Sequence, residues 1–321
     1  MCRRPLRSWS LRCAPAERYS SPVFDGLTLT KGHGAGNDFV LVPDPLGAHD
    51  ISPEIVAQIC DRHTGIGGDG LIRVIHTEAL LREDPSLATL FPGESLPEWF
   101  MDYRNADGSI AEMCGNGVRV FVHYLCCQGL VDLEPGGSVA VATRGGIKNV
   151  TFDAPDYTVD MGEYQLPFGP DGADTRVSIP GVGERLALSV AMPNPHTVVL
   201  LENDDELAAA DFHATPGYDP VPEFGTNLEL AVDRPGARTL GGTSPSERVE
   251  MRVLERGVGE TLACGTGTCA VALAVLFGRG ESEGVVPIHS PGGNLSVRIE
   301  AGRAYLTGPA KLVADFSLLN R

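Results

Sequence analysis

The chain has 321 residues, of which 42% are hydrophobic, and a formal net charge of -17. A chain of this length and composition can bury a substantial core and suits two domains of ordinary size. No run of about 18 or more apolar residues occurs, so no membrane span is expected. The acidic charge argues against a nucleic-acid partner, because phosphate binding needs clustered lysine and arginine side chains.

The first 24 residues differ in composition from the rest of the chain. They contain five arginines against one acid, Glu17, together with several serines and prolines. They lack the apolar core of a secretory signal, although an arginine-rich, acid-poor segment has some likeness to an organelle transit peptide. We expect residues 1–24 to be a disordered or spurious N-terminal extension that takes no part in the fold.

Short strands, one helix and glycine-rich loops are predicted at the start of the first half. Strands over residues 27–31 and 39–42 flank a glycine-rich loop, and residues 53–60 predict a helix with Ser52 as its N-cap. The four glycines of residues 61–70 indicate a loop that turns sharply or lies against another element.

Two copies of one short motif follow, one in each half of the chain. The polar residues 77–97, which include prolines, predict a surface insertion before the first copy. Cys114-Gly-Asn-Gly opens a helix that is apolar on one face only. Cys264-Gly-Thr-Gly opens a helix over residues 268–277 that is apolar nearly all round and is expected to be buried.

The chemistry of these motifs follows from the properties of a helix start. The first turn presents N–H groups without partners and a partial positive charge, which favour a thiolate and a bound anion. Each cysteine also lies nine residues after a polar side chain, Asn105 in one copy and Glu255 in the other. Two such cysteines on opposite sides of one carbon atom would remove a proton from one face and donate a proton to the other. The pair therefore predicts inversion of a stereocentre by thiols that ionise near neutral pH.

Strand-like alternation dominates the second half, which begins between residues 145 and 161. It is clearest at Val249, Met251 and Val253, which alternate with charged residues. A last strand over residues 313–318 is expected to return to the first domain. Further strands are predicted over residues 185–190, 197–201, 227–232, 296–299 and 304–306.

The eight cysteines include no CxxC pair. This spacing supports neither a structural zinc site nor the disulfide framework of a small secreted protein, so reduced thiols in the cytosol are expected. Cys126, Cys127 and Cys269 lie in the predicted apolar helices and are expected in the core. Cys60 closes a helix and has no recognisable partner.

Several motifs, in order from about Leu27 to the C-terminus, resemble those of the diaminopimelate epimerase family. The two cysteine blocks are specific to this family and its near relatives. The motifs are His33-Gly-Ala-Gly-Asn-Asp-Phe, Asp61-Arg-His-Thr-Gly-Ile-Gly-Gly-Asp-Gly, Asn105-Ala-Asp-Gly with Met113-Cys-Gly-Asn-Gly, Pro193-Asn-Pro-His, Gly225-Thr-Asn, and Glu255-Arg-Gly-Val-Gly-Glu with Ala263-Cys-Gly-Thr-Gly.

The resemblance implies an α+β fold of two pseudo-symmetric domains, each a curved, mostly antiparallel sheet around a central helix. The N-terminal domain is then expected over residues 25–157, carrying Cys114, with residues 310–321 returning to it. The C-terminal domain is expected over residues 158–309, carrying Cys264. The active site would lie in the cleft between the two domains.

The resemblance also implies a function. Members of this family epimerise LL-2,6-diaminopimelate to meso-2,6-diaminopimelate, in lysine and peptidoglycan-precursor biosynthesis, with no cofactor and no metal. The implied enzyme is cytoplasmic and a homodimer, and its partner is its small-molecule substrate. Cys114 and Cys264 would be the catalytic acid and base. The implied substrate-binding residues are Asn37, Asn105, Asn194, Asn227, Glu255 and Arg256 through their side chains, and Gly115, Asn116, Gly265 and Thr266 through their backbone.

Three features leave questions open at this stage: Gly70, His196 and the neighbours Glu255 and Arg256. Many family members have Gln where this chain has Gly70, so a side-chain contact to the substrate is missing or is replaced by backbone or water. His196 either supports the site, by orienting a neighbour or helping proton transfer, or is a structural histidine with satisfied hydrogen bonds. Glu255 and Arg256 would alternatively form a surface ion pair.

Other functions remain as alternatives. A different cofactor-independent amino-acid racemase of the same fold would use the same thiols. A cysteine hydrolase would need only one of them, with His196 or His63 as its base. A non-catalytic protein would use the helix starts only to hold an anion. A mechanism based on pyridoxal phosphate is disfavoured, because only Lys31, Lys148 and Lys311 are available for a Schiff base.

Overall fold

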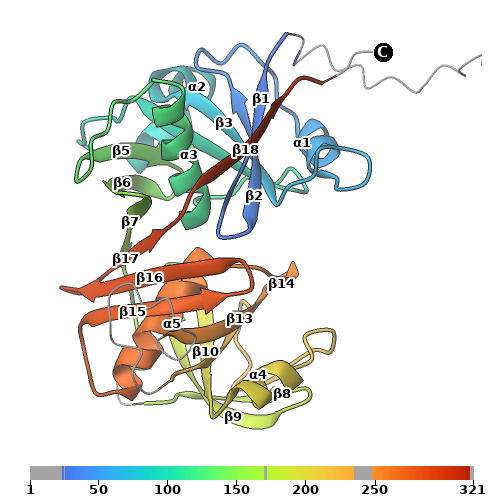
Figure 1. Cartoon of the computed structure of the whole chain (residues 1–321), viewed down its shortest axis with the longest axis vertical. Helices are drawn as coiled ribbons and strands as arrows, with labels where there is room; N and C mark the ends of the chain where they lie inside the picture. Colours follow the sequence, from blue (N-terminus) through green and yellow to red (C-terminus); the bar gives the residue numbers. More distant parts are fainter. Residues whose placement is uncertain (1–23, 25, 170–171, 235–247, 319–321) are drawn as a thin grey trace, which may run out of the picture.

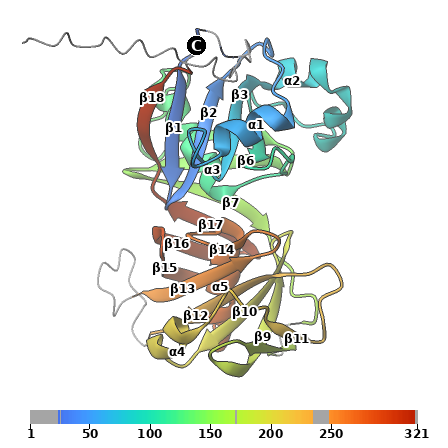
Figure 2. The ribbon, with the colours of Figure 1, turned by 90° about the vertical axis from the view of Figure 1, so that its right-hand side faces the viewer.

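The structure is a computed structural model that describes residues 24, 26–169, 172–234 and 248–318. Apart from Phe24, the expected N-terminal extension lies outside the described residues. Figures 1 and 2 show two lobes, an N-terminal and a C-terminal domain. The lobes meet where β7 (Asp156–Glu163) pairs with β17 (Arg303–Gly308). In the described part of the chain, no helix is long and apolar enough to cross a membrane.

The remaining elements alternate between strands and short helices in both domains. In the N-terminal domain they are β1 (Leu29–Gly34), β2 (Asn37–Pro43), α1 (Pro53–Cys60), β3 (Gly70–His76), α2 (Thr77–Glu83), the 3-10 helix η2 (Pro85–Leu90), β4 (Trp99–Asn105), α3 (Gly115–Cys127), β5 (Ser138–Thr143), β6 (Gly146–Asp153) and, from the end of the chain, β18 (Lys311–Phe316). In the C-terminal domain they are β8 (Thr175–Ile179), β9 (Gly183–Ala191), β10 (Pro195–Leu201), α4 (Asp204–Ala209), β11 (Gly217–Asp219), β12 (Asn227–Val232), β13 (Val249–Glu255), β14 (Gly259–Thr261), α5 (Gly265–Gly278), β15 (Gly284–Ser290) and β16 (Gly293–Glu300).

One series of paired strands runs through both domains. Its order is β18-β1-β2-β3-β4-β5-β6-β7 in the N-terminal domain and β17-β16-β15-β13-β12-β10-β9 in the C-terminal domain. Most pairs are antiparallel, and the parallel ones are β2–β3, β4–β5, β10–β12 and β13–β15. β18 lies beside β1 in Figure 1, with Phe316 opposite Leu29, so the end of the chain packs on the first domain.

Each domain wraps its sheet around one helix. α3 contacts β1, β2 and β7, while α5 contacts β10, β15 and β16. α5 is buried from Gly265 to Leu276 apart from Thr266, which confirms the prediction of an apolar, central helix. The prediction that the first helix is only amphipathic is wrong. α3 is buried nearly throughout its length, and even Arg119 has no exposed surface.

Local sequence signals account for several element boundaries. The Ser52 side chain accepts a hydrogen bond from the Ile55 N–H at 3.4 Å, which confirms it as the cap of α1. The expected loop between the first two strands is wrong, because β1 and β2 form a tight hairpin. Its turn residues Ala35 and Gly36 have φ angles of 51° and 78°, a left-handed conformation that closes the hairpin in two residues.

Two further expectations are corrected by tertiary packing. Residues 77–97 are not merely a surface insertion, because they form α2 and η2, and Leu80 and Phe91 pack against β4. Cys127 is exposed at the end of α3 rather than in the core, whereas Cys269 is fully buried. Both errors arise because the sequence pattern alone does not show which face another element covers.

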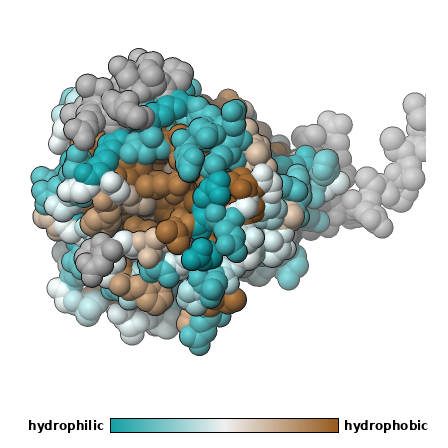
Figure 3. Space-filling view, turned by 90° about the horizontal axis from the view of Figure 1, so that it is seen from below, coloured by the Kyte–Doolittle hydropathy of each residue, from teal (hydrophilic) through white to brown (hydrophobic). Residues whose placement is uncertain are grey.

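The end of the C-terminal domain carries a patch of apolar residues. Figure 3, which views the molecule from below the orientation of Figure 1, shows this patch surrounded by hydrophilic residues. It lies at the end of the molecule away from the contact between the domains.

Candidate functional site

The two cysteine-bearing helices begin at one point between the domains. Cys114 is the N-cap residue of α3 and Cys264 is the N-cap residue of α5. A methyl group built on Gly265 would lie 3.5 Å from the Cα atom of Gly115 and 3.7 Å from the Asn116 nitrogen. The first turns therefore abut, so the N-terminal ends of both helices, where the partial positive charge of each helix lies, meet between the domains.

A pocket of about 640 Å³ opens beside the helix starts. Both domains contribute to it: the β1–β2 hairpin and the loop before β3 form one wall, and the segment from Val258 to Ala263 forms the opposite wall. The polar residues that line it are Lys31, His33, Asn37, Asp38, Arg62, Asp69, Glu260 and Thr261. Its volume is in the range of small-ligand sites in proteins.

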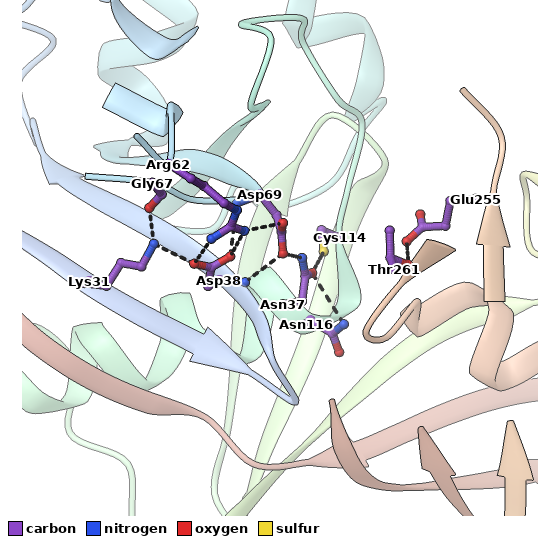
Figure 4. Close-up of polar contacts among 10 residues, drawn as sticks. All are labelled: Lys31, Asn37, Asp38, Arg62, Gly67, Asp69, Cys114, Asn116, Glu255 and Thr261. Atoms are coloured by element: carbon purple, nitrogen blue, oxygen red, sulfur yellow. Dashed lines mark hydrogen bonds and ion pairs between the residues drawn. The ribbon is translucent and has the colours of Figure 1, made fainter. Parts of the chain in front are cut away.

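The thiol of Cys114 lies against the first residue of β2. Its sulfur donates to the Asn37 side-chain oxygen at 3.4 Å and accepts a hydrogen bond from the Gly117 N–H, also at 3.4 Å. The Asn116 amide donates to the same Asn37 oxygen at 3.5 Å. Figure 4 shows these three side chains together, with Asn37 between Cys114 and Asp69.

The thiol of Cys264 lies in a different environment. Its sulfur is 3.4 Å from the Thr266 hydroxyl. The Glu255 carboxylate, at the end of β13, accepts a hydrogen bond from the Thr261 hydroxyl at 2.5 Å and is close enough to interact with Cys264. Glu255 thus faces the site, and among the described residues its carboxylate is bound by Thr261 rather than by Arg256.

Burial controls the ionisation of both thiols. It raises the pKa of Cys114 to about 11, with the charge of Glu255 acting in the same direction and the backbone N–H of Gly117 opposing it. Burial, Glu255 and Glu229 together raise the pKa of Cys264 well above its ordinary value. The expectation that these thiols ionise near neutral pH is therefore wrong for this arrangement, because desolvation outweighs the helix start.

The Glu255 carboxyl, beside these thiols, also has a raised pKa. Burial raises the pKa of the Glu255 carboxyl, and Glu229 adds to this effect, while the hydrogen bonds of Thr261 and Cys264 oppose it. A cluster of acids and thiols in one buried site is typical of groups that exchange protons.

His196 and Glu229 form a buried pair behind the second helix start. The two side chains have no exposed surface, and His196 Nδ1 lies 2.7 Å from Glu229 Oε1. His196 Nε2 donates to the Asn194 side-chain oxygen at 3.1 Å, because that oxygen can only accept. A methyl group on Gly267 would lie 2.5 Å from Glu229 Oε1, so this carboxylate touches the first turn of α5.

Asn227 and Arg256 are held by the backbone around them. The Asn227 side-chain oxygen accepts a hydrogen bond from the Arg256 N–H at 2.9 Å. The Arg256 guanidinium donates to the Phe224 carbonyl oxygen, and this side chain is otherwise exposed. Asn227 lies opposite His196 in the parallel pair β12–β10, so the two side chains come from adjacent strands at the same level.

Asn105 ends β4 on the N-terminal side of the site. Its amide donates to the Ser109 hydroxyl at 2.9 Å, and its backbone lies opposite Gly70 in the β3–β4 pair. The structure thus brings five of the predicted residues together at the helix starts: Cys114, Gly115, Asn116, Cys264 and Gly265. Asn37 and Glu255 contact them, whereas Asn194, Asn227 and Arg256 lie around His196 at the ends of β10, β12 and β13.

Gly70 has no room for a side chain. A Cβ atom there would lie 2.4 Å from the Arg104 carbonyl oxygen, 2.6 Å from the Tyr103 ring and 3.1 Å from the Tyr103 hydroxyl. Tyr103 is buried, and its ring packs edge-on against Phe39. The space beside Gly70 is therefore occupied by Tyr103, which explains why this chain departs from the family pattern here.

This crowding predicts the outcome of restoring the family's residue. We expect Gly70→Gln to lower the free energy of unfolding by about 1–3 kcal/mol, because the added side chain overlaps backbone as well as Tyr103. Urea unfolding measures the effect. Gly217→Gln is the control, since its nearest neighbour, Ser178, would lie an ordinary 3.4 Å away. Equal stability of the Gly70→Gln variant and the wild type would contradict this reading of the site.

Sequence reasoning missed three polar residues of the site. Glu229 lies in β12, whose six residues are all buried, and Arg119 lies in the apolar helix α3. A charged residue inside an otherwise apolar element was the signal that could have found both. Asp69, which holds Asn37, lies within a recognised motif but was given no role.

A comparison with known families assigns the chain. The family model described as diaminopimelate epimerase matches residues 29–167 and 188–313. The chain belongs to the diaminopimelate epimerase family. The resemblance found in the sequence motifs is thereby confirmed.

Relatives within the diaminopimelate epimerase family match nearly the whole chain. The diaminopimelate epimerase of Streptomyces coelicolor is 44% identical over 299 residues, covering 90% of this chain and 94% of the relative. That of Corynebacterium glutamicum (strain ATCC 13032) is 39% identical over 300 residues, covering 90% and 96%. That of Mycobacteroides abscessus is 41% identical over 298 residues, covering 90% and 95%.

Solved structures share the fold of this diaminopimelate epimerase family member at low sequence identity. A phenazine biosynthesis protein of the PhzF family from Bacillus anthracis matches with a TM-score of 0.62 at 13% identity, covering 91% of this chain and 99% of the other. A hydroxyproline epimerase from Agrobacterium vitis matches with a TM-score of 0.58 at 13% identity, covering 91% and 90%. The expected α+β fold of two similar domains is thereby confirmed.

Proposed function

We propose that this chain epimerises LL-2,6-diaminopimelate to meso-2,6-diaminopimelate without a cofactor, using Cys114 and Cys264 as the acid and base. The observation that carries the proposal is the contact between Gly115 and Gly265, which brings the two cysteine-bearing helix starts to one point. Family membership supports the substrate, since the relatives are named diaminopimelate epimerase.

The proposed step is a proton exchange at one carbon atom. The thiolate of one cysteine removes the α-proton, and the thiol of the other donates its proton to the opposite face. The negative charge that develops on the α-carboxylate is met by the N–H groups of Gly115, Asn116, Gly265 and Thr266. After one turnover the two cysteines have exchanged protonation states, and proton exchange with solvent restores them before the next forward turnover.

The raised pKa values of the thiols suit this chemistry. An α-hydrogen beside a carboxylate is a very weak acid, and a thiolate whose conjugate acid has a high pKa is a stronger base than an ordinary thiolate. Burial excludes water from the same space, so the helix N–H groups act in a low dielectric. Preorganised donors then replace the electron sink that a cofactor would supply.

The residues proposed to bind substrate form two groups, one beside the helix starts and one farther from them. Asn37 and Glu255 lie beside the thiols, whereas Asn194, Asn227 and Arg256 lie farther along the C-terminal domain. We assign the latter set, with Asn105, to the second amino and carboxylate group of diaminopimelate. A substrate without that group would leave these buried or half-buried polar atoms unpaired, which supports discrimination against simple amino acids.

The geometry gives less support to the alternative functions. Among the described residues, neither Cys114 nor Cys264 hydrogen-bonds to a histidine, and His196 is engaged by Glu229 and Asn194. This argues against a hydrolase with a Cys–His pair. A binding protein would need one helix start to hold an anion, and the convergence of two cysteine-bearing starts favours catalysis.

Deuterium incorporation tests the proposed function. When LL-diaminopimelate is incubated with the protein in D2O, early meso product should carry deuterium at the inverted carbon, while recovered LL substrate should carry none. The reason is that the thiol that donates is not the one that removed the proton. NMR or mass spectrometry of each isomer at low conversion measures this. No turnover, or equal labelling of substrate and product, would refute the two-thiol proposal.

We further propose that the protein acts in the cytoplasm as a homodimer. Family likeness supports both assignments. β18 pairs only with β1 among the described strands and carries the exposed side chain of Val313, so its outer edge is available to a second copy.

A further inference from the structure

We propose that Asp69 is a positioning residue for Cys114, acting through the side-chain amide of Asn37. The inference rests on the proposed role of Cys114 and adds a residue that neither the motifs nor the mechanism above assigned. Its basis is a directed series of hydrogen bonds that fixes which end of the Asn37 amide faces the sulfur.

The series runs from a buried cation to an anchored carboxylate. Arg119 donates to the Asn116 side-chain oxygen at 2.7 Å, so the Asn116 amide nitrogen must point away from it. That nitrogen donates to the Asn37 oxygen at 3.5 Å. The Asn37 nitrogen in turn donates to Asp69 Oδ2 at 2.7 Å. Both amides are thus oriented from both ends.

Asp69 is itself held in place by several donors. The backbone N–H of Asp38 donates to Asp69 Oδ2 at 3.1 Å, and the Arg62 guanidinium lies 2.8 Å from Asp69 Oδ1. Arg62 also binds Asp38, which Lys31 approaches at 2.7 Å from the other side. Figure 4 shows this cluster of two carboxylates and two cations beside Asn37.

The cations of this cluster keep the Asp38 carboxyl ionised at neutral pH. Burial raises the pKa of the Asp38 carboxyl, but the hydrogen bonds and charges of Arg62 and Lys31 outweigh burial and hold that pKa well below its usual range. At the other end, burial lowers the pKa of Arg119 to about 10, so its guanidinium still carries its charge at neutral pH. Arg119 therefore donates to Asn116 as a charged group at neutral pH and fixes the direction of the series from that end.

The consequence for Cys114 is a defined hydrogen-bond partner. With Asp69 in place, the Asn37 oxygen faces the sulfur, so it accepts from a thiol and repels a thiolate. Without Asp69, only the longer 3.5 Å hydrogen bond from Asn116 opposes a 180° rotation of the amide, which would present its N–H group to the sulfur and stabilise a thiolate. Asp69 thus favours the protonated form of Cys114, which is the form that donates a proton to the substrate.

The test compares Asp69→Asn in two backgrounds. The pH dependence of iodoacetamide alkylation at Cys114, followed by mass spectrometry of its peptide, gives the thiol pKa. We expect Asp69→Asn to lower this pKa by about one pH unit and kcat/KM by about tenfold or more. In the Asn37→Ala background, Asp69→Asn should leave the pKa nearly where Asn37→Ala alone puts it.

The Asn37→Ala background shows whether Asp69 acts on Cys114 through the Asn37 amide or directly through its negative charge. Glu255, Arg119 and Tyr103 are the other ionisable groups whose charges interact with Cys114, and none of them is changed. Glu260→Gln removes one negative charge from the opposite wall of the same pocket and should shift the Cys114 pKa much less. Asp69 is 42% exposed, so its substitution leaves the core packing intact.

The outcomes of this test distinguish the proposed role of Asp69 from a direct charge effect and from a structural role. An equal fall in the Cys114 pKa in both backgrounds would mean that the charge of Asp69 acts directly, and an unchanged pKa with lost activity would mean a structural role only. Either result overturns the inference about Asp69. Neither affects the proposed function, which fails only if the protein lacks epimerase activity or retains it without Cys114.

Discussion

Alanine in place of either Cys114 or Cys264 is expected to reduce the rate of epimerisation by at least about 1,000-fold. Each cysteine is fixed as the N-cap of a buried helix, so neither sulfur can reach the opposite face of a bound α-carbon. Loss of one thiol removes the base in one direction of the reaction and the acid in the other. Both variants should therefore lose activity from both isomers, measured by coupled or chromatographic assay with LL- and meso-diaminopimelate.

A third cysteine supplies the matched control. Cys127 lies at the end of α3 and is exposed, and the Cys127→Ala variant should keep wild-type kcat/KM. Both active-site variants should still unfold cooperatively, with only a modest fall in Tm, because alanine deletes a buried sulfur that at Cys114 also accepts the Gly117 N–H. If Cys114→Ala or Cys264→Ala retained more than about a tenth of the activity, the two-thiol mechanism would be excluded.

Local signals in the sequence were sufficient for the helix starts and the caps. Ser52 before Pro53 and the two Cys-Gly pairs each define a helix start within four residues, because capping depends on neighbours in the chain. The all-apolar composition of α5 was equally direct evidence for a buried helix. These features required no knowledge of the partner elements.

Features that depend on distant parts of the chain were not predictable in this way. The sequence predicts α3 to be apolar on one face only, but β18 and β17, almost 200 residues later, also pack on this helix, and Arg119 is buried. The thiol pKa values were predicted in the wrong direction for the same reason. A helix start is visible in the sequence, whereas the burial that raises the pKa of Cys114 depends on residues far from it in the chain, such as Asn37.

The identity of the site residues illustrates the same limit. The motifs located Asn37 and Asp69 but did not show that one amide would join them to Cys114. Likewise, the sequence shows that Gly70 departs from the family pattern, but only the structure shows that Tyr103 occupies the space beside Gly70. Roles that depend on the direction of a hydrogen bond or on free volume need coordinates.

The second large effect is expected at a contact between the domains. Gly292, in the turn between β15 and β16, lies against the turn of the β1–β2 hairpin. A methyl group on Gly292 would lie 1.9 Å from the Ala35 carbonyl oxygen, and one on Gly36 would lie 2.9 Å from the Gly292 Cα atom. The absence of a side chain at Gly292 thus permits the two domains to approach at this point.

Gly292→Ala therefore tests whether this approach positions the thiols. Gly292 is not among the glycines with a left-handed φ, so alanine fits its backbone, and within its own domain the nearest atom, the Leu262 carbonyl oxygen, would lie 3.1 Å away. The clash with Ala35 must instead separate the domains. A displacement of about 1 Å at the helix starts costs on the order of 100-fold in rate, so we expect kcat/KM to fall by about that factor with little change in Tm.

Gly217→Ala is the control for this experiment, because it adds the same methyl group to the C-terminal domain at a distance of 3.4 Å from its nearest neighbour, Ser178. It should leave both kcat/KM and Tm unchanged. A Gly292→Ala variant with wild-type kcat/KM would mean that the hairpin contact does not set the spacing of the two cysteines. A large fall in Tm would instead assign the effect to the fold of the C-terminal domain. A loss of rate without a loss of stability would show that catalysis depends on the contact between Gly292 and Ala35, which sets how closely the two helix starts approach.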